Sequence, residues 1–165
     1  MQSQNKKNGF ILLELLLGLL ISVLFAVFVF RGFGQMLSSW DNLSTKTNLH
    51  DVSHYIISIM EKNITYDSSL VTIARDSKSI DTLVCQTVHG NMLYTFSCEN
   101  ERIYKAIQKA STVGKNPLYV SDCKVDSWHI SKINDHLLGI ELSLSQKQYN
   151  IKVTRYIYCM NGRIN

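Results

Sequence analysis

Residues 10–30 read FILLELLLGLLISVLFAVFVF, and Glu14 is the only charged side chain among them. As an α-helix this stretch is about 30 Å long, enough to cross the hydrocarbon core of a bilayer. Lys6 and Lys7 precede it, and positive charges there favour a cytoplasmic N-terminus. The stretch therefore predicts a single membrane-spanning helix, with the chain after Arg31 outside the cytoplasm.

A removable secretory signal peptide also has a basic start and an apolar region. Its apolar region is usually shorter and is followed by small residues at the cleavage site. In this chain residues 28–33 read FVFRGF, which are bulky where small residues are needed. The pattern disfavours a removable signal, and a plain signal anchor is the alternative that stays open.

Glu14 is unusual for a plain anchor. A carboxylate inside an apolar helix costs roughly 2.5–3.5 kcal/mol on insertion scales, unless its charge is neutralised. Ionisable residues inside membrane segments are therefore interpreted as functional, with a partner to be named.

Residues 6–14, which read KKNGFILLE, resemble the prepilin peptidase motif of type IV pilins, pseudopilins and competence pilins. The resemblance implies cleavage after Gly9, N-methylation of the new first residue Phe10, and an assembly role for Glu14 at the fifth mature position. Two departures are small: Ile11 replaces the common threonine, and no helix-kinking proline lies in the run. We expect the new α-amino group of Phe10 on an adjacent subunit to neutralise Glu14 and fix the stagger between subunits.

We expect four parts along the chain: a cleaved cytoplasmic leader (1–9), a transmembrane helix (10–30), an amphipathic helical extension (31–66) and a β-rich globular head (67–165). In the extension, apolar residues recur at three- and four-residue spacing, namely Leu49, Val52, Ile56 and Ile59. Residues 31–34 read RGFG and form a weak point, because each glycine lowers helix propensity by roughly 1 kcal/mol. Residues 63–67 end the helical pattern.

The head is rich in β-branched and aromatic residues that predict strands. The expected strands are Ser79–Val88, Met92–Cys98, Ile103–Ile107, Leu118–Val120, Cys123–Ile133, Leu137–Leu144 and Tyr149–Cys159. We expect a turn at 89–91, a break at 99–102, a polar loop around 114–117 and a closing hairpin turn at 145–148. The predicted fold class is α+β, with a long N-terminal helix packed on an antiparallel sheet in a pilin-like layout.

The strand pattern over most of residues 80–160 resembles the ComGF-like minor pseudopilins of Gram-positive competence pili. It is also similar to the J-type minor pseudopilins of type II secretion. This likeness rests on the order of strands and loops, and it favours a minor subunit over a major one.

Four cysteines fall on the exported side, where disulfides form and persist: Cys85, Cys98, Cys123 and Cys159. Four cysteines allow three sets of pairings, and free buried thiols are the alternative. If a hairpin turns at Gly90, Cys85 lies opposite Thr95 and Cys98 points to the other face, which disfavours their pairing. The absence of Cys-x-x-Cys spacing argues against a zinc or redox site.

Other side chains give little sign of a catalytic or metal site. His50 and His54 are one helical turn apart, but they lie opposite the apolar stripe and no third ligand is evident. His89 lies in the expected turn, and the sequence shows no partner for His129 or His136. There is no nucleophile constellation or phosphate-binding glycine loop. We therefore expect neither an enzyme nor a metal or other cofactor.

The charge of the chain gives no support for a nucleic-acid surface. The net charge is +4, and residues 31–165 hold 15 basic and 12 acidic side chains without clustering. A binding surface for DNA would gather Lys and Arg beside aromatic residues. Contact between the head and DNA is therefore possible but not indicated by charge.

These patterns together predict a minor pilin or pseudopilin of a competence (DNA-uptake) machine. The expected partners are prepilin peptidase, other minor and major pilins, and the membrane. The expected location is the cell membrane, with one pass and an extracytoplasmic head, and the filament after assembly. Two alternatives stay open: a minor subunit of a type II secretion pseudopilus, and a membrane-tethered extracellular binding domain that never polymerises.

Overall fold

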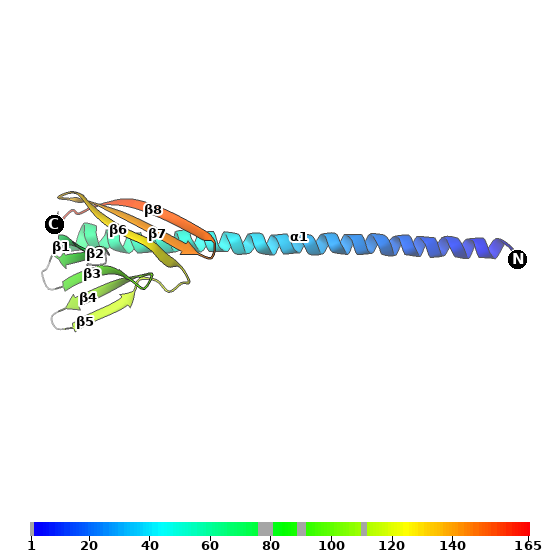
Figure 1. Cartoon of the computed structure of the whole chain (residues 1–165), viewed down its shortest axis with the longest axis horizontal. Helices are drawn as coiled ribbons and strands as arrows, with labels where there is room; N and C mark the ends of the chain where they lie inside the picture. The colour runs from blue at the N-terminus through cyan, green and yellow to red at the C-terminus, as the bar shows by residue number, and fades with distance from the viewer. Residues whose placement is uncertain (1, 76–80, 89–91, 110–111) are drawn as a thin grey trace. The chain divides into compact units, whose positions relative to one another are not determined.

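The computed structural model describes residues 2–75, 81–88, 92–109 and 112–165. The chain divides into two compact units, Met1–Ser44 and Thr45–Asn165. Helix α1 spans Gln2–Lys62 and is followed by a π-helical turn, η1, at Asn63–Asp67 (Figure 1). The strands are β1 Ser68–Arg75, β2 Asp81–Thr87, β3 Met92–Glu99, β4 Arg102–Lys109, β5 Thr112–Pro117, β6 Lys124–Asn134, β7 Leu137–Gln146, β8 Tyr149–Tyr158 and β9 Arg163–Ile164.

The first unit consists of the N-terminal part of α1. Its segment from Ile11 onward is long and apolar enough to cross a membrane. Helix α1 continues unbroken through Gly32 and Gly34, where the sequence predicted a weak point. Glycine lowers helix propensity but still provides both backbone hydrogen-bonding groups, so two such residues do not interrupt a helix of this length.

The second unit, Thr45–Asn165, contains the last part of α1 and two β-sheets. It is larger than the head expected at 67–165, because the end of the helix belongs to it, and it is called the head from here on. Sheet A is six-stranded with the order β5-β4-β3-β2-β1-β9, and sheet B is three-stranded with the order β6-β7-β8. All neighbouring strands are antiparallel except β9, which pairs in parallel with β1. The predicted α+β fold is therefore confirmed, with two sheets where the sequence predicted one.

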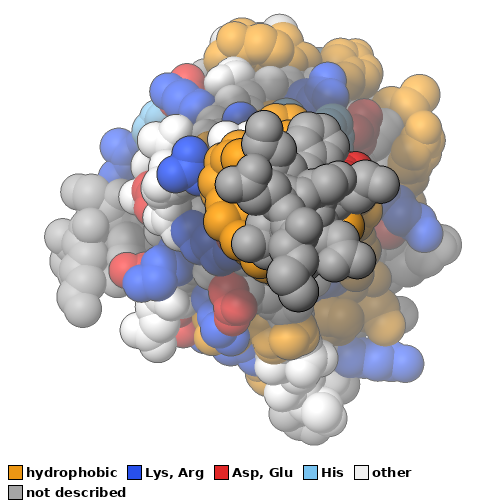
Figure 2. Space-filling model, turned by 90° about the vertical axis from the view of Figure 1, so that its right-hand side faces the viewer, with side chains coloured by type: hydrophobic (Ala, Val, Ile, Leu, Met, Phe, Trp, Pro, Cys, Tyr) orange, Lys and Arg blue, Asp and Glu red, His pale blue; other side chains and the backbone are white. Residues whose placement is uncertain are grey.

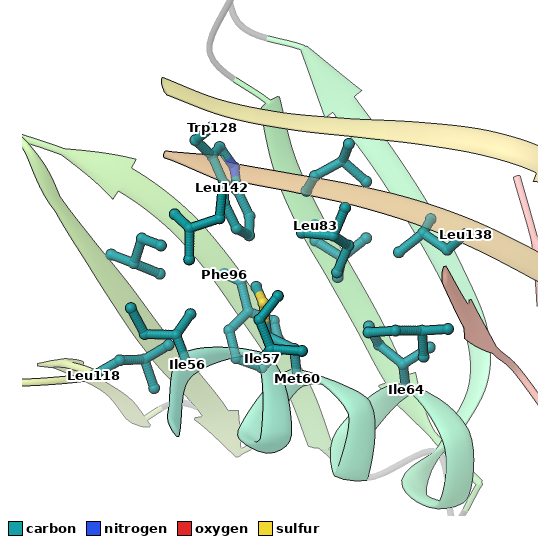
Figure 3. Close-up of a cluster of buried hydrophobic side chains, with 14 of the residues drawn as sticks. Ile56, Ile57, Met60, Ile64, Leu83, Phe96, Leu118, Trp128, Leu138 and Leu142 are labelled. Carbon is teal, nitrogen blue, oxygen red and sulfur yellow. The ribbon is translucent and has the colours of Figure 1, made fainter. Parts of the chain in front are cut away.

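One hydrophobic core joins these three layers. Figure 3 shows side chains from the end of α1, from sheet A and from sheet B pointing toward one another. Ile56 and Met60 of α1, Phe96 of β3 and Leu142 of β7 are all fully buried. In the predicted stripe of α1, three residues are buried and Ile59 is half-buried, so the helical periodicity identified the face that packs on the sheets.

Three features of the head differ from the sequence prediction. The expected polar loop around 114–117 belongs to strand β5, an exposed edge strand paired only with β4. An edge strand tolerates polar residues and a terminal proline, so its composition resembles that of a loop and does not indicate a strand. Leu118–Val120, predicted as a strand, lies outside any strand, although Leu118 is buried. Strands β1 and β9 were not predicted at all.

The other predicted strands are present with shifted ends. The expected turn at 89–91 and the first residues of the predicted strand at 79–80 lie outside the described residues. The break at 99–102 is a tight turn in which Asn100 and Glu101 have φ values of 49° and 60°. Lys147, with φ of 55°, makes the turn of the closing hairpin between β7 and β8.

Candidate functional site

The predicted assembly residue Glu14 lies on one face of α1 together with small and apolar side chains. A shallow groove on this face is lined by Ile11, Glu14, Leu15, Gly18, Leu19 and Ser22. Gly18 leaves open space there, since a Cβ built on it would meet nothing within 4 Å. The hydroxyl of Ser22 donates a hydrogen bond to the Gly18 carbonyl at 2.8 Å. The residue spacing of three and four places this groove along a single helix face.

Among the side chains that the structure describes in the first unit, from Ile11 to Ser44, the carboxylate of Glu14 has no cation nearby. Between Ile11 and Ser44 the only basic residue is Arg31, about 25 Å away along a helix. The large apolar side chains around Glu14 are exposed, for example Leu13 at 64% and Leu15 at 69%. A carboxylate on an apolar helix face is stabilised by a cationic partner, and a new chain end at Phe10 is the candidate that the sequence motif offers.

The predicted cleavage site, Gly9 and Phe10, lies within α1, one helical turn before Glu14. This spacing is what the resemblance to prepilins requires, and cleavage and methylation stay predictions.

The head contains an ionic cluster around one buried carboxylate, which the sequence did not reveal. Asp81, at the start of β2, has a side chain that is only 1% exposed. Its Oδ1 accepts a hydrogen bond from Arg75 Nε at 2.7 Å, and its Oδ2 accepts one from the Ile130 backbone N–H at 2.8 Å. His129 Nδ1 lies 2.7 Å from the same Oδ2. Asp81 therefore joins sheet A to β6, the edge strand of sheet B.

This environment determines the charge state of Asp81. Burial by itself raises the pKa of the carboxyl group. The hydrogen bonds from Arg75 and the Ile130 N–H, with the charges of Arg75 and His129, outweigh burial and lower the pKa below its usual value. The group is consequently ionised at neutral pH and acts as a structural joint between the sheets. A carboxylate at the boundary of a predicted strand was the only signal in the sequence.

The four candidate disulfide cysteines are all free thiols in the structure. Cys85 pairs with Tyr94 across β2 and β3, so the expectation that it lies opposite Thr95 is wrong by one residue of register. A shift of one residue also changes the face, and Cys98 therefore lies on the same face as Cys85 rather than on the other one. Burial raises the pKa of Cys85 to about 12 and also raises that of Cys98.

The histidines do not come together as a metal site. His50 and His54 are exposed on α1, as the apolar stripe predicted. His129 is bound to Asp81, and His136 contacts the Gly162 carbonyl at 2.9 Å and the ring of Tyr158. His89 lies outside the described residues. Among the residues that the structure describes, no group of three or more metal-binding side chains is present.

Basic side chains do not gather on the face of the head that Figure 2 shows. Lys and Arg lie at separate places there, with acidic and uncharged residues between them. Several lysines are neutralised by ion pairs, including Lys124 with Glu101 and Lys152 with Glu141. No family model, curated protein or solved structure matches the chain.

Proposed function

We propose that this chain is a minor subunit of a type IV pilin-like filament that serves a competence (DNA-uptake) machine. It is made as a prepilin, cut after Gly9, N-methylated at Phe10 and assembled through α1. The head faces the outside and contacts other minor and major pilins. The proposal assigns the chain no catalytic activity and no cofactor.

The observation that carries the proposal is the carboxylate of Glu14 on an exposed apolar helix face, where the described side chains from Ile11 to Ser44 provide no nearby cation. The motif at residues 6–14 supplies the missing cation, because cleavage creates an ammonium group at Phe10. In a packed bundle of helices of low dielectric constant, such a pair is strong and specifies one stagger between neighbours. The open space at Gly18 on the same face supports close helix packing, since small residues let helices approach in membranes.

The choice of a competence machine rests on the strand order in residues 80–160 and its similarity to ComGF-like pseudopilins. Deletion of the gene is expected to abolish DNA uptake and leave protein secretion intact. Loss of secretion with normal DNA uptake would instead assign the chain to a type II secretion pseudopilus.

The first experiment is intact mass and N-terminal sequencing of the chain from its native membrane, with and without prepilin peptidase. We expect a chain that begins at N-methylated Phe10 only when the peptidase is present. A chain that keeps residues 1–9 in both strains would refute the proposal and make the protein a membrane-tethered extracellular domain.

A second experiment separates cleavage from assembly. Glu14→Gln keeps the shape of the side chain and removes its charge, so we expect normal membrane insertion and loss of incorporation into filaments. Ser22→Ala, two turns along the same groove, is the matched control and should assemble normally. Normal incorporation of Glu14→Gln would show that the charge of Glu14 does not guide assembly.

A further inference from the structure

Lys105 is a charged residue on the inner face of sheet A. It follows the buried Ile103 by two positions on β4, so both side chains point toward the core. Its Nζ donates a hydrogen bond to Asn63 Oδ1 at 2.9 Å. Asn63 begins η1 and is 5% exposed, and its Nδ2 donates to the Ile59 carbonyl. The carboxamide of Asn63 is therefore held in place at both of its polar atoms, directly beside an amine.

Aromatic rings surround this amine. Lys105 Nζ lies 4.3 Å from the ring centroid of Tyr94 and 5.8 Å from that of Phe96. Burial is the main cause that lowers the pKa of Lys105, and the positive charge of Lys62 lowers it further. The negative charge of Asp67 and the thiol of Cys85 act in the opposite direction and raise it. Desolvation of this kind favours the neutral, nucleophilic form of a lysine.

We propose that Lys105 and Asn63 become joined by an intramolecular amide bond, which the folded head forms without another enzyme. Nζ of Lys105 attacks Cγ of Asn63, so that an N–C bond forms. The Cγ–Nδ2 bond breaks, and Nδ2 leaves as ammonia. One amine and one primary amide are thus converted into one secondary amide and ammonia, with no oxidant or reductant.

Within this proposal we assign the acid–base step to Asp67, the carboxyl group whose charge acts on Lys105. Asp67 lies one helical turn after Asn63 in η1. A carboxyl group there takes the proton that Nζ loses and delivers it to the departing nitrogen, and it ends in its starting state. The remaining requirement is that the amine moves from the carbonyl oxygen to the face of the carboxamide, which the rotatable bonds of lysine permit.

The fold supplies the proximity on which such a reaction depends. Holding two reactants within contact distance in one geometry raises their effective concentration by several orders of magnitude. The bond would connect η1, directly after the helix, to strand β4 of sheet A and close the chain between residues 63 and 105. If the head belongs to a filament, this bond lies between the helix that holds the subunit and the sheet that the helix supports.

The test is mass spectrometry of the full chain, extracted in detergent from its native membrane. We expect an intact mass about 17 Da, the mass of one ammonia, below the mass calculated for the same chain with the N-terminus that sequencing finds, whether or not the leader has been removed. Ammonia is also lost by ring closure at Asn161-Gly162, so the site must be located. Peptide mapping is expected to find one branched peptide that contains both Lys105 and Asn63.

Lys105→Arg is the matched control, because it keeps the charge and the hydrogen-bond donors but removes the primary amine. It should give two separate peptides, and in a denaturing gel it should migrate more slowly than the looped native chain. Asp67→Asn should also give separate peptides, and a retained bond in this variant would overturn the role of Asp67. Separate, unmodified peptides from the native chain would overturn the proposal as a whole.

Discussion

Replacement of Asp81 by asparagine tests the joint between the two sheets of the head. The Asp81 carboxylate has two oxygens, and both accept hydrogen bonds, from Arg75 and from the Ile130 N–H. In Asp81→Asn one oxygen becomes an amide nitrogen that cannot accept. Either the Ile130 N–H or the Arg75 guanidinium then loses its acceptor, and the negative charge is lost as well.

The magnitude follows from burial. A buried donor left without an acceptor costs about 1–3 kcal/mol. Loss of the charge pair with Arg75 adds little, because the Arg75 side chain is 55% exposed and solvent screens the pair. We therefore expect Asp81→Asn to lower the free energy of unfolding by about 1–3 kcal/mol, which corresponds to roughly 4–12 °C in Tm for a unit of this size.

Trp128 provides the signal for this measurement. It is 8% exposed, and its indole Nε1 donates a hydrogen bond to the Asp81 carbonyl at 2.7 Å. Urea unfolding of the full chain in mild detergent, followed by tryptophan emission in a Trp40→Phe background, gives the free energy directly. Asp126→Asn, an exposed carboxylate on the same strand as Trp128, is the control and should change stability by less than about 0.5 kcal/mol.

The lowered pKa of Asp81 also predicts how the stability of the head depends on pH. The pKa of Asp81 is lower in the folded protein than in the unfolded chain, where it is near 3.8. The ionised group therefore contributes fully to the free energy of unfolding above that unfolded pKa. The contribution is lost as the pH falls through the lower folded value. The native chain should therefore be destabilised by acid more than Asp81→Asn is. Equal acid sensitivity of the two proteins, or equal stability at pH 7, would refute the role of Asp81 as a joint.

Three further predictions concern the head. Gly162→Ala should lower the free energy of unfolding by more than roughly 2 kcal/mol, because a Cβ there would lie 2.1 Å from a backbone oxygen of β1. Gly114→Ala, with open space around it, should be neutral in the same urea unfolding assay. Ile56→Ala, at a fully buried position on α1, should cost about 2–5 kcal/mol in urea unfolding. In the native chain at pH 8, a maleimide should label the half-buried Cys98 before Cys85, whose pKa is raised to about 12 by burial; the order should disappear in denaturant.

The sequence predicted the helix and most of the strands because their signals are local. An apolar run of the length of a bilayer, and a stripe with helical spacing, depend only on neighbouring residues. The strands at 124–134 and 149–158 carry alternating apolar residues for the same reason. Strand β5 was missed because this particular edge strand buries none of its residues, and the alternation that marks a strand comes from burial.

The division into two sheets and the register of β2 on β3 could not be predicted in the same way. Both depend on contacts between residues far apart in sequence, and a register error of one residue reverses every face assignment. For that reason Cys98 was assigned to the wrong face. Lys105 did carry a usable signal, since Ile103, Lys105 and Ile107 alternate along one strand, which places a charge on the inward face.

Asp81 and Lys105 show what such inward charges do in this head. Asp81 links sheet A to β6, and Lys105 links sheet A to the end of α1 at Asn63. Two boundaries around the core therefore have a charged side chain with fixed hydrogen-bond partners, whereas the centre of the core is apolar. Apolar packing tolerates sliding of one layer over another, but a buried charge loses its partners on a shift of even one residue. We infer that these two groups select one arrangement of helix and sheets, which a subunit needs if its head is to meet its neighbours at fixed positions.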